Sequence, residues 1–91
     1  QMISYAGIFP YYYELNLSSL QKLIDKNSLQ ENEIINIELL KKLQVLKKKE
    51  KKLLKILGNG ELNSKNSIEC NKITISAQKK LEKLGIEIKI N

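Results

Sequence analysis

The side chains of this sequence that could do chemistry are mostly lysines. All sixteen basic residues of the 91 are lysine, and with ten acidic residues the formal net charge is +6. Histidine, the commonest general base, is absent, and the single cysteine, Cys70, cannot build a zinc site. No spacing sets a serine, lysine or cysteine nucleophile against a base. The sequence therefore predicts a protein that is not an enzyme and has no metal or cofactor.

The excess of lysine favours a polyanionic partner. Lysine ammonium groups neutralise phosphates and release their counterions. Arginine, whose planar fork suits bidentate contacts to bases, is absent. The residue types therefore favour contacts with a nucleic-acid backbone over base reading. A solvated lysine surface without any anionic partner is the alternative.

Two short motifs and the cysteine have simpler structural interpretations. Gly58-Asn59-Gly60 is too short for a nucleotide loop, which needs further glycines and a Lys-Ser/Thr pair, so it predicts a tight turn. Tyr11, Tyr12 and Tyr13 could stack on bases, but such residues more often line a strand. Cys70 is predicted to be a small core residue.

The elements that must position these side chains are short. Weak alternation predicts a strand over 12–17, and Asn16 or Ser18 could cap a following helix. The apolar face of that helix would be Leu20, Leu23 and Ile24. Residues 25–33 are polar and predict a loop, after which Asn36 is expected to cap a second helix, with Glu38 in its first turn. The apolar residues of that second helix would be Leu39, Leu40, Leu43 and Leu46.

The middle of the chain is ambiguous by periodicity. Leu53, Leu54 and Leu57 keep helical spacing with the leucines before the lysine run 47–52. Residues 37–57 could therefore form one long basic amphipathic helix, or a helix, a loop and a strand. Periodicity alone favours the long helix slightly.

The last third has clearer signals. Residues 67–73 predict a strand whose inward side chains are Ile68, Cys70 and Ile73. Thr74 or Ser76 could cap a helix that ends at Gly85 in a left-handed cap. Its apolar stripe would be Ala77, Leu81 and Leu84, and we expect Leu81 and Leu84 to be buried against the strands over 53–57 and 86–90. That terminal strand would be half-buried, with Ile86, Ile88 and Ile90 on one side.

Length and composition predict one small domain. No apolar run approaches the roughly 20 residues of a membrane-spanning helix. The first residues lack the basic-then-apolar form of a secretory signal, and one cysteine implies no oxidising compartment. We therefore expect a soluble intracellular protein.

One segment resembles a known family. Residues 55–62, Lys-Ile-Leu-Gly-Asn-Gly-Glu-Leu, are similar to the hallmark segment of the bacterial-type ribosomal protein fifteen family of the large subunit. The register continues without a gap through the strand at 68–73, the Ser-x-Ser-Ala-like helix at 74–85 and the last strand. Residues 13–20 and 33–46 resemble the family's earlier strand and its Glu-Leu-Leu helix. The resemblance covers about residues 13–90 of the C-terminal globular domain.

The sequence departs from that family in four places. Ile73 stands at a usual phenylalanine, Ile86 at the second glycine of a pair, and Gln44 at a usual glycine. The family's basic N-terminal tail, rich in glycine and arginine, is absent from this sequence. Gln1-Met2 could be the remnant of its junction, and the chain is expected to be a fragment or a reduced form of the family.

The resemblance implies a fold and partners. The fold would be an α/β single domain over 1–91, an irregular superhelix of strand-strand-helix turns, in which the lysine run is a loop rather than part of a long helix. The chain would be a structural constituent of the large ribosomal subunit. Its partners would be large-subunit rRNA and neighbouring large-subunit proteins, with no small-molecule substrate. The arginine-free composition predicts an organellar ribosome, of mitochondrion or plastid, with the bacterial cytoplasm as the alternative.

The rRNA contacts are expected from two groups of residues. The predicted contact residues are Lys47, Lys48, Lys49, Lys51, Lys52, Lys72, Ser76, Lys79 and Lys80. We expect the last helix to matter more than the lysine run, because flexible loop lysines can re-aim and helix-mounted ones cannot. The competing hypothesis is a lysine-rich helical interaction module that binds no nucleic acid and is mostly helix.

Overall fold

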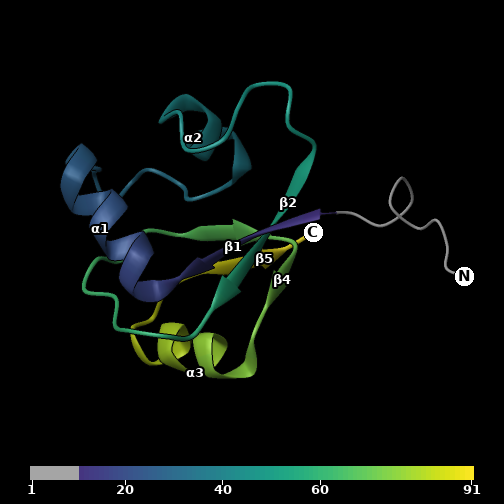
Figure 1. Cartoon of the computed structure of the whole chain (residues 1–91). Helices are drawn as coiled ribbons and strands as arrows, with labels where there is room; N and C mark the ends of the chain where they lie inside the picture. The colour runs from purple at the N-terminus through teal and green to yellow at the C-terminus, as the bar shows by residue number, and fades with distance from the viewer. Residues whose placement is uncertain (1–10) are drawn as a thin grey trace, which may run out of the picture.

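Parallel strands in two small sheets organise the chain, and its computed structural model describes residues 11–91. The first sheet has three strands, in the order β1 (Tyr11–Asn16), β2 (Lys52–Leu57) and β4 (Lys72–Ile73). The second sheet pairs β3 (Ile68–Cys70) with β5 (Ile88–Ile90). The helices are α1 (Leu17–Asn27), α2 (Ile37–Lys42) and α3 (Ile75–Lys83) (Figure 1).

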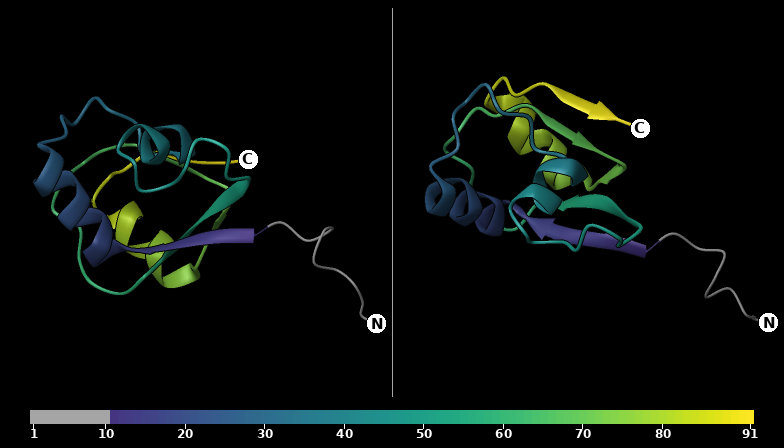
Figure 2. Two further views of the ribbon diagram at one scale, coloured as in Figure 1. Left: turned by 45° about the horizontal axis from the view of Figure 1, so that its top comes forward. Right: turned by 90° about the horizontal axis from the view of Figure 1, so that it is seen from above.

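The backbone passes alternately through the first and the second sheet. Ile35 bridges in parallel to Ile68, so it marks the first position of the second sheet. Along the chain, β1, Ile35, β2, β3, β4 and β5 then belong in turn to the first and the second sheet. Figure 2 shows β1 and β2 running opposite to β5, as successive halves of a coil must. The result is an irregular superhelix of three turns, which confirms the predicted α/β class.

The coil brings apolar residues of successive turns into register. Across the first sheet, Leu15 pairs with Ile56, and Ile56 pairs with Ile73. Leu15 and Ile56 are buried and Ile73 is half-buried. In the second sheet Ile35, Ile68 and Ile88 align in the same way. These aligned rows face the core, where most of the apolar stabilisation of so small a domain arises.

The first helices follow their predicted signals. Asn16, not Ser18, is the N-cap of α1, which runs three residues further than expected. It ends where Ser28 adopts a left-handed conformation, with a φ of 50°. At α2 the predicted cap is confirmed, because the Asn36 side chain accepts a hydrogen bond from the Leu39 N–H at 2.8 Å.

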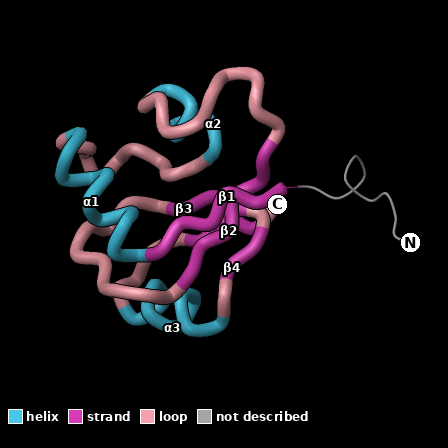
Figure 3. The backbone as a smooth tube through the Cα atoms, in the orientation of Figure 1, coloured by secondary structure: helices cyan, strands magenta, loops and turns pink. Residues whose placement is uncertain are grey.

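The long helix that periodicity favoured over 37–57 is wrong. α2 stops at Lys42, and Gln44, where the resemblance places a usual glycine, takes a left-handed conformation with a φ of 65°. Leu46 is buried but lies outside the helix. Figure 3 shows a loop crossing from α2 to β2, as the resemblance implied.

The predicted strand over 67–73 is two strands in different sheets. The chain leaves β3 at Asn71 and enters β4, and Asn71 contacts β2 twice. Its N–H donates to the Leu54 carbonyl at 2.9 Å, and its side-chain oxygen accepts the Leu54 N–H at 3.0 Å. These bonds replace ladder pairing while the chain changes sheets, and no side-chain pattern could reveal that change.

The last helix and strand follow the prediction with two corrections. Thr74 caps α3, since its hydroxyl accepts the Ala77 N–H. Gly85, with a φ of 73°, ends the helix in a Schellman motif, because the Ile86 N–H reaches the Leu81 carbonyl at 3.1 Å. Leu84, however, is half-buried, and Ile90 is 55% exposed rather than inward.

Two helices mark the ends of β2. α2 lies near the start of this strand and α3 near its end (Figure 1). Six residues at about 3.3 Å each separate these ends by roughly 20 Å. Within residues 11–91, no helix is both long enough and apolar enough to span a bilayer. Gln1-Met2, the predicted junction remnant, lies outside the described residues.

Candidate nucleic-acid interface

The net charge of the chain is concentrated at the α2 end of β2. Seven of the sixteen lysines but only one of the ten acidic residues lie within 41–52, so this segment carries a formal charge of +6. The remaining nine lysines are balanced by nine acidic residues. We call residues 41–52 the lysine segment. It includes Lys41 and Lys42, in the last turn of α2, which the sequence-based site omitted although a count of charge along the chain would have found them.

Four lysines of this segment surround one hollow, of about 550 Å³, beside the end of α2. They are Lys41, Lys42, Lys47 and Lys48. Its remaining lining residues, Gln44 and Leu46, are uncharged. A concave surface lined by one sign of charge focuses the field on an incoming polyanion.

The loop that carries the lysine run is held in shape by Glu50. The Glu50 carboxylate accepts the Lys47 N–H at 2.8 Å and lies 3.3 Å from the Lys52 ammonium. The Lys47 N–H, followed by Lys52, lowers the pKa of Glu50 below its ordinary value. The Glu50 N–H in turn donates to the Lys47 carbonyl at 3.1 Å. The backbone around Lys47–Glu50 is thus a closed turn, and only the lysine side chains are left to re-aim.

Most of the predicted contact residues near α3 are exposed to solvent, and one makes its contacts within the protein. Ser76 and Lys79 are exposed. Lys72 is also exposed, and its ammonium lies 5.6 Å from the centre of the Tyr12 ring, within the range of a cation–π contact. Tyr11 is 56% exposed, whereas Tyr13 packs against the core.

The Lys80 side chain is held by contacts within the protein. Its ammonium donates to the carbonyls of Gly58 and Gly60, at 2.9 Å each, and lies 3.0 Å from the Glu61 carboxylate. A lysine has three N–H donors, and here each has a protein acceptor. Lys80 therefore clamps the predicted turn 58–60 to α3, and its contact with RNA stays a prediction.

The turn 58–60 packs closely against the starts of α1 and α3, and this close packing is the reason for its two glycines. A side chain at Gly58 would meet the Ser76 hydroxyl and, at 2.9 Å, the Ala77 nitrogen. Gly60 has a φ of 90°, and a side chain there would approach the Ser18 backbone nitrogen to 2.8 Å. The Ser18 N–H also donates to the Asn59 carbonyl at 3.0 Å. The motif therefore serves close packing, as expected for a tight turn.

Removing the Lys80 clamp should destabilise the domain. We expect Lys80→Met to lower the free energy of unfolding by about 1–2 kcal/mol, because two charge-assisted hydrogen bonds are lost at a half-exposed site. Lys79→Met, a matched change at the neighbouring exposed position, should leave stability nearly unchanged. Urea unfolding measures both variants, and equal losses would contradict the clamp.

The remaining residue that could do reactive chemistry is Cys70. Cys70 is buried in the core, as predicted, and its burial raises the pKa of the thiol. Among residues 11–91, no group of three metal-ligating side chains comes together. The interface is therefore described by charge and shape alone.

Comparison with known proteins places the chain in a family. The family model that matches is described as covering the ribosomal proteins 50S-L15 and 50S-L18e together with a 60S counterpart. It matches residues 14–89, nearly the whole of the coil described above. The chain belongs to this family. Its similarity is to the uL15 branch, as the resemblance of residues 55–62 implied.

Individual uL15 relatives agree with the family match. The large ribosomal subunit protein uL15 of Pelagibacter ubique is 42% identical over 76 residues, which cover 84% of this chain and 49% of that protein. The uL15 proteins of Bradyrhizobium diazoefficiens and Mesoplasma florum are 39% and 37% identical, over 85% and 87% of this chain. The chain spans about half the length of these relatives. Membership of a ribosomal protein family also confirms that the chain is not an enzyme.

Proposed function

We propose that this chain is a structural constituent of the large ribosomal subunit that binds and braces rRNA through lysine–phosphate contacts. Membership of the uL15 family carries the proposal, and the lysine segment supplies its mechanism. The A-form major groove is too deep and narrow for side chains to read, so contacts made by ammonium groups go mainly to phosphates and sugars. Neighbouring large-subunit proteins would contact other faces.

The positions of the lysines support a bracing role. The lysine segment lies at the start of β2, whereas Lys72, Ser76 and Lys79 lie near its end, roughly 20 Å away. Groups so far apart would contact different phosphates, so the rigid coil would hold two stretches of RNA at a fixed separation. Of the predicted contacts, Lys80 is the exception, because its donors already serve turn 58–60.

The competing hypothesis fits the fold poorly. A lysine-rich helical module was expected to be mostly helix, yet 52–57, 68–70, 72–73 and 88–90 are strands. The compartment of this ribosome, an organelle or the bacterial cytoplasm, stays a prediction. Composition favours an organelle, whereas the relatives named above come from bacteria, which supports the bacterial alternative.

The mechanism predicts a steep dependence of RNA binding on salt. Each neutralised phosphate releases counterions, so five or six contacts should weaken binding by about a thousandfold between 50 and 200 mM salt. Filter binding of the purified chain to a large-subunit rRNA fragment measures this slope. An affinity that does not change over this range would exclude an electrostatic mechanism.

A further inference from the structure

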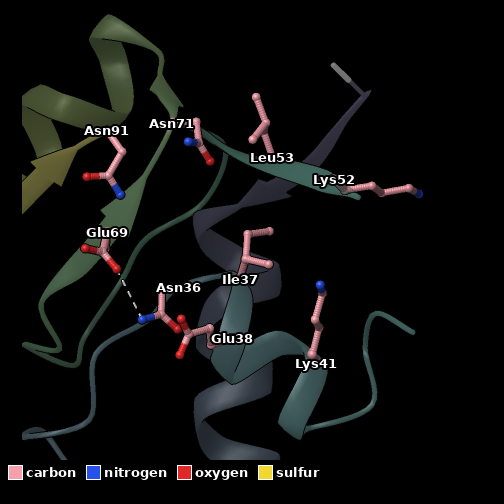
Figure 4. A pocket seen from close by; sticks show the side chains of 9 residues that line it. All are labelled: Asn36, Ile37, Glu38, Lys41, Lys52, Leu53, Glu69, Asn71 and Asn91. Atoms are coloured by element: carbon pink, nitrogen blue, oxygen red, sulfur yellow. Dashed lines mark hydrogen bonds between the residues drawn. The ribbon is translucent and has the colours of Figure 1, made fainter. Parts of the chain in front are cut away.

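A groove next to the lysine segment has the lining of a nucleotide site. Its volume is about 390 Å³, within the range of ligand pockets, and it lies between α2 and the start of β2. Figure 4 shows Ile37 and Lys41 projecting from α2 toward the strand that carries Lys52 and Leu53. Ile37 is half-buried and offers an apolar surface to the groove, whereas the Leu53 side chain projects from β2 away from Ile37 (Figure 4).

The charged and amide groups of the groove are segregated. Lys41 and Lys52 lie at one end, the amides of Asn71 and Asn91 gather with Glu69 at the other, and a second carboxylate, Glu38, lines the groove beside Asn36 (Figure 4). Among residues 11–91, no ion pair engages Lys41, while Lys52 pairs only with Glu50. Lys41 is therefore the cation left open to a phosphate, and it connects the groove with the four-lysine hollow because it lines both.

The amide end is fixed in advance. Because the Asn71 oxygen accepts the Leu54 N–H at 3.0 Å, its NH₂ group is left as an oriented donor. The Glu69 carboxylate is already engaged, because it accepts the Asn36 amide at 3.3 Å and lies 3.5 Å from the Lys89 ammonium. Its hydrogen bonds to Asn36 and Asn91 lower the pKa of the carboxyl. The oriented Asn71 donor is therefore the group that this end offers to the edge of a base.

We propose that this groove binds one unpaired nucleotide of an RNA strand, with the base against Ile37, its edge at Asn71, and its phosphate at Lys41. The inference rests on the proposed function and adds a base-reading site to a surface that otherwise contacts phosphates. Proteins that recognise RNA by sequence mostly take unstacked bases from loops and bulges. An acidic peptide fits less well, because its carboxylates would lie against Glu69.

A bulged hairpin tests the groove separately from general RNA binding. The probes are an RNA hairpin with one bulged nucleotide and the same hairpin without it, titrated with the full chain by fluorescence anisotropy. The wild-type chain should bind the bulged hairpin about tenfold more tightly, as one base contact provides. The bulge preference, rather than absolute affinity, is the readout.

Two variants with a matched control locate the effect. Asn71→Asp keeps the acceptor for the Leu54 N–H but removes the donor, and should abolish the bulge preference. Asn63→Asp makes the same charge change at an exposed loop position and should retain it. Ile37→Ala removes the apolar wall of the groove and provides a second test if Asn71→Asp does not fold.

The outcomes separate the two proposals. Equal, salt-dependent binding of both hairpins by the wild-type chain would overturn the groove and leave the proposed function standing. A bulge preference that survives in both folded variants would also overturn the groove. Failure to bind either hairpin would overturn the proposed function and the groove with it.

Discussion

Leu81→Ala is expected to lower the free energy of unfolding by about 2–5 kcal/mol, the usual cost of emptying a fully buried leucine site. Leu81 has no exposed surface, and α3 packs on β2, the central strand of the first sheet. Alanine favours helix at least as well as leucine, so the loss would come from packing. It would remove a large part of the margin of so small a domain.

Leu84→Ala supplies the control for this prediction. It makes the same change at the C-cap of the same helix, where the side chain is only half-buried. Its loss should be less than half that of Leu81→Ala in chemical unfolding followed by circular dichroism. A loss at Leu81 below about 0.5 kcal/mol, the range of surface changes, would mean that α3 packs through another face.

β2 shows why periodicity misjudged the middle of the chain. Its inward residues, Leu54 and Ile56, alternate as a strand requires, but the outer positions Leu53 and Leu57 are also apolar and half-buried. An apolar run of this kind fits helical spacing equally well. The family resemblance resolved the ambiguity because it carried the position of turn 58–60.

Asn71 and Lys80 show what local pattern could not provide. The change of sheet at Asn71 depends on hydrogen bonds to Leu54, seventeen residues earlier. Lys80 was predicted to face RNA because it lies off the apolar stripe of α3, yet its partners, Gly58 and Gly60, are at least twenty residues away. Tertiary contacts at such separations decide roles that helical geometry leaves open.

The lysine segment, in contrast, could be predicted from the sequence alone. Lys41 and Lys42 complete a cluster that is visible in the sequence, because the formal charge of 41–52 equals that of the whole chain. The fold adds that Lys41, Lys42, Lys47 and Lys48 surround one hollow.

Reversing Lys47 and Lys48 to glutamate is expected to reduce incorporation into large subunits at least about tenfold in competition with the wild-type chain. Hydrogen bonds to charged groups contribute about 1.5–3 kcal/mol each, so two lost contacts exceed that factor. The sequence-based expectation ranked Lys72→Glu with Lys79→Glu as more damaging. The charge distribution favours the opposite order, because the residues outside 41–52 are balanced in charge, and both orders stay predictions.

A second double variant at two other lysines controls for the change in net charge. Lys22 and Lys65 are exposed and lie outside both groups, so reversing them changes the net charge equally. This variant should incorporate nearly as well as the wild-type chain. Thermal unfolding of each double variant establishes that all of them fold.

Occupancy in purified large subunits measures directly whether this chain binds the ribosome through the lysine segment. Tagged variants are expressed beside the untagged wild-type chain, and the two are quantified by mass spectrometry in the isolated subunit. We expect stoichiometric wild-type chain, strong loss of the Lys47/Lys48 variant, intermediate loss of the Lys72/Lys79 variant and little loss of the Lys22/Lys65 control. Absence of the wild-type chain from large subunits, or full occupancy by the folded Lys47/Lys48 variant, would contradict this expectation.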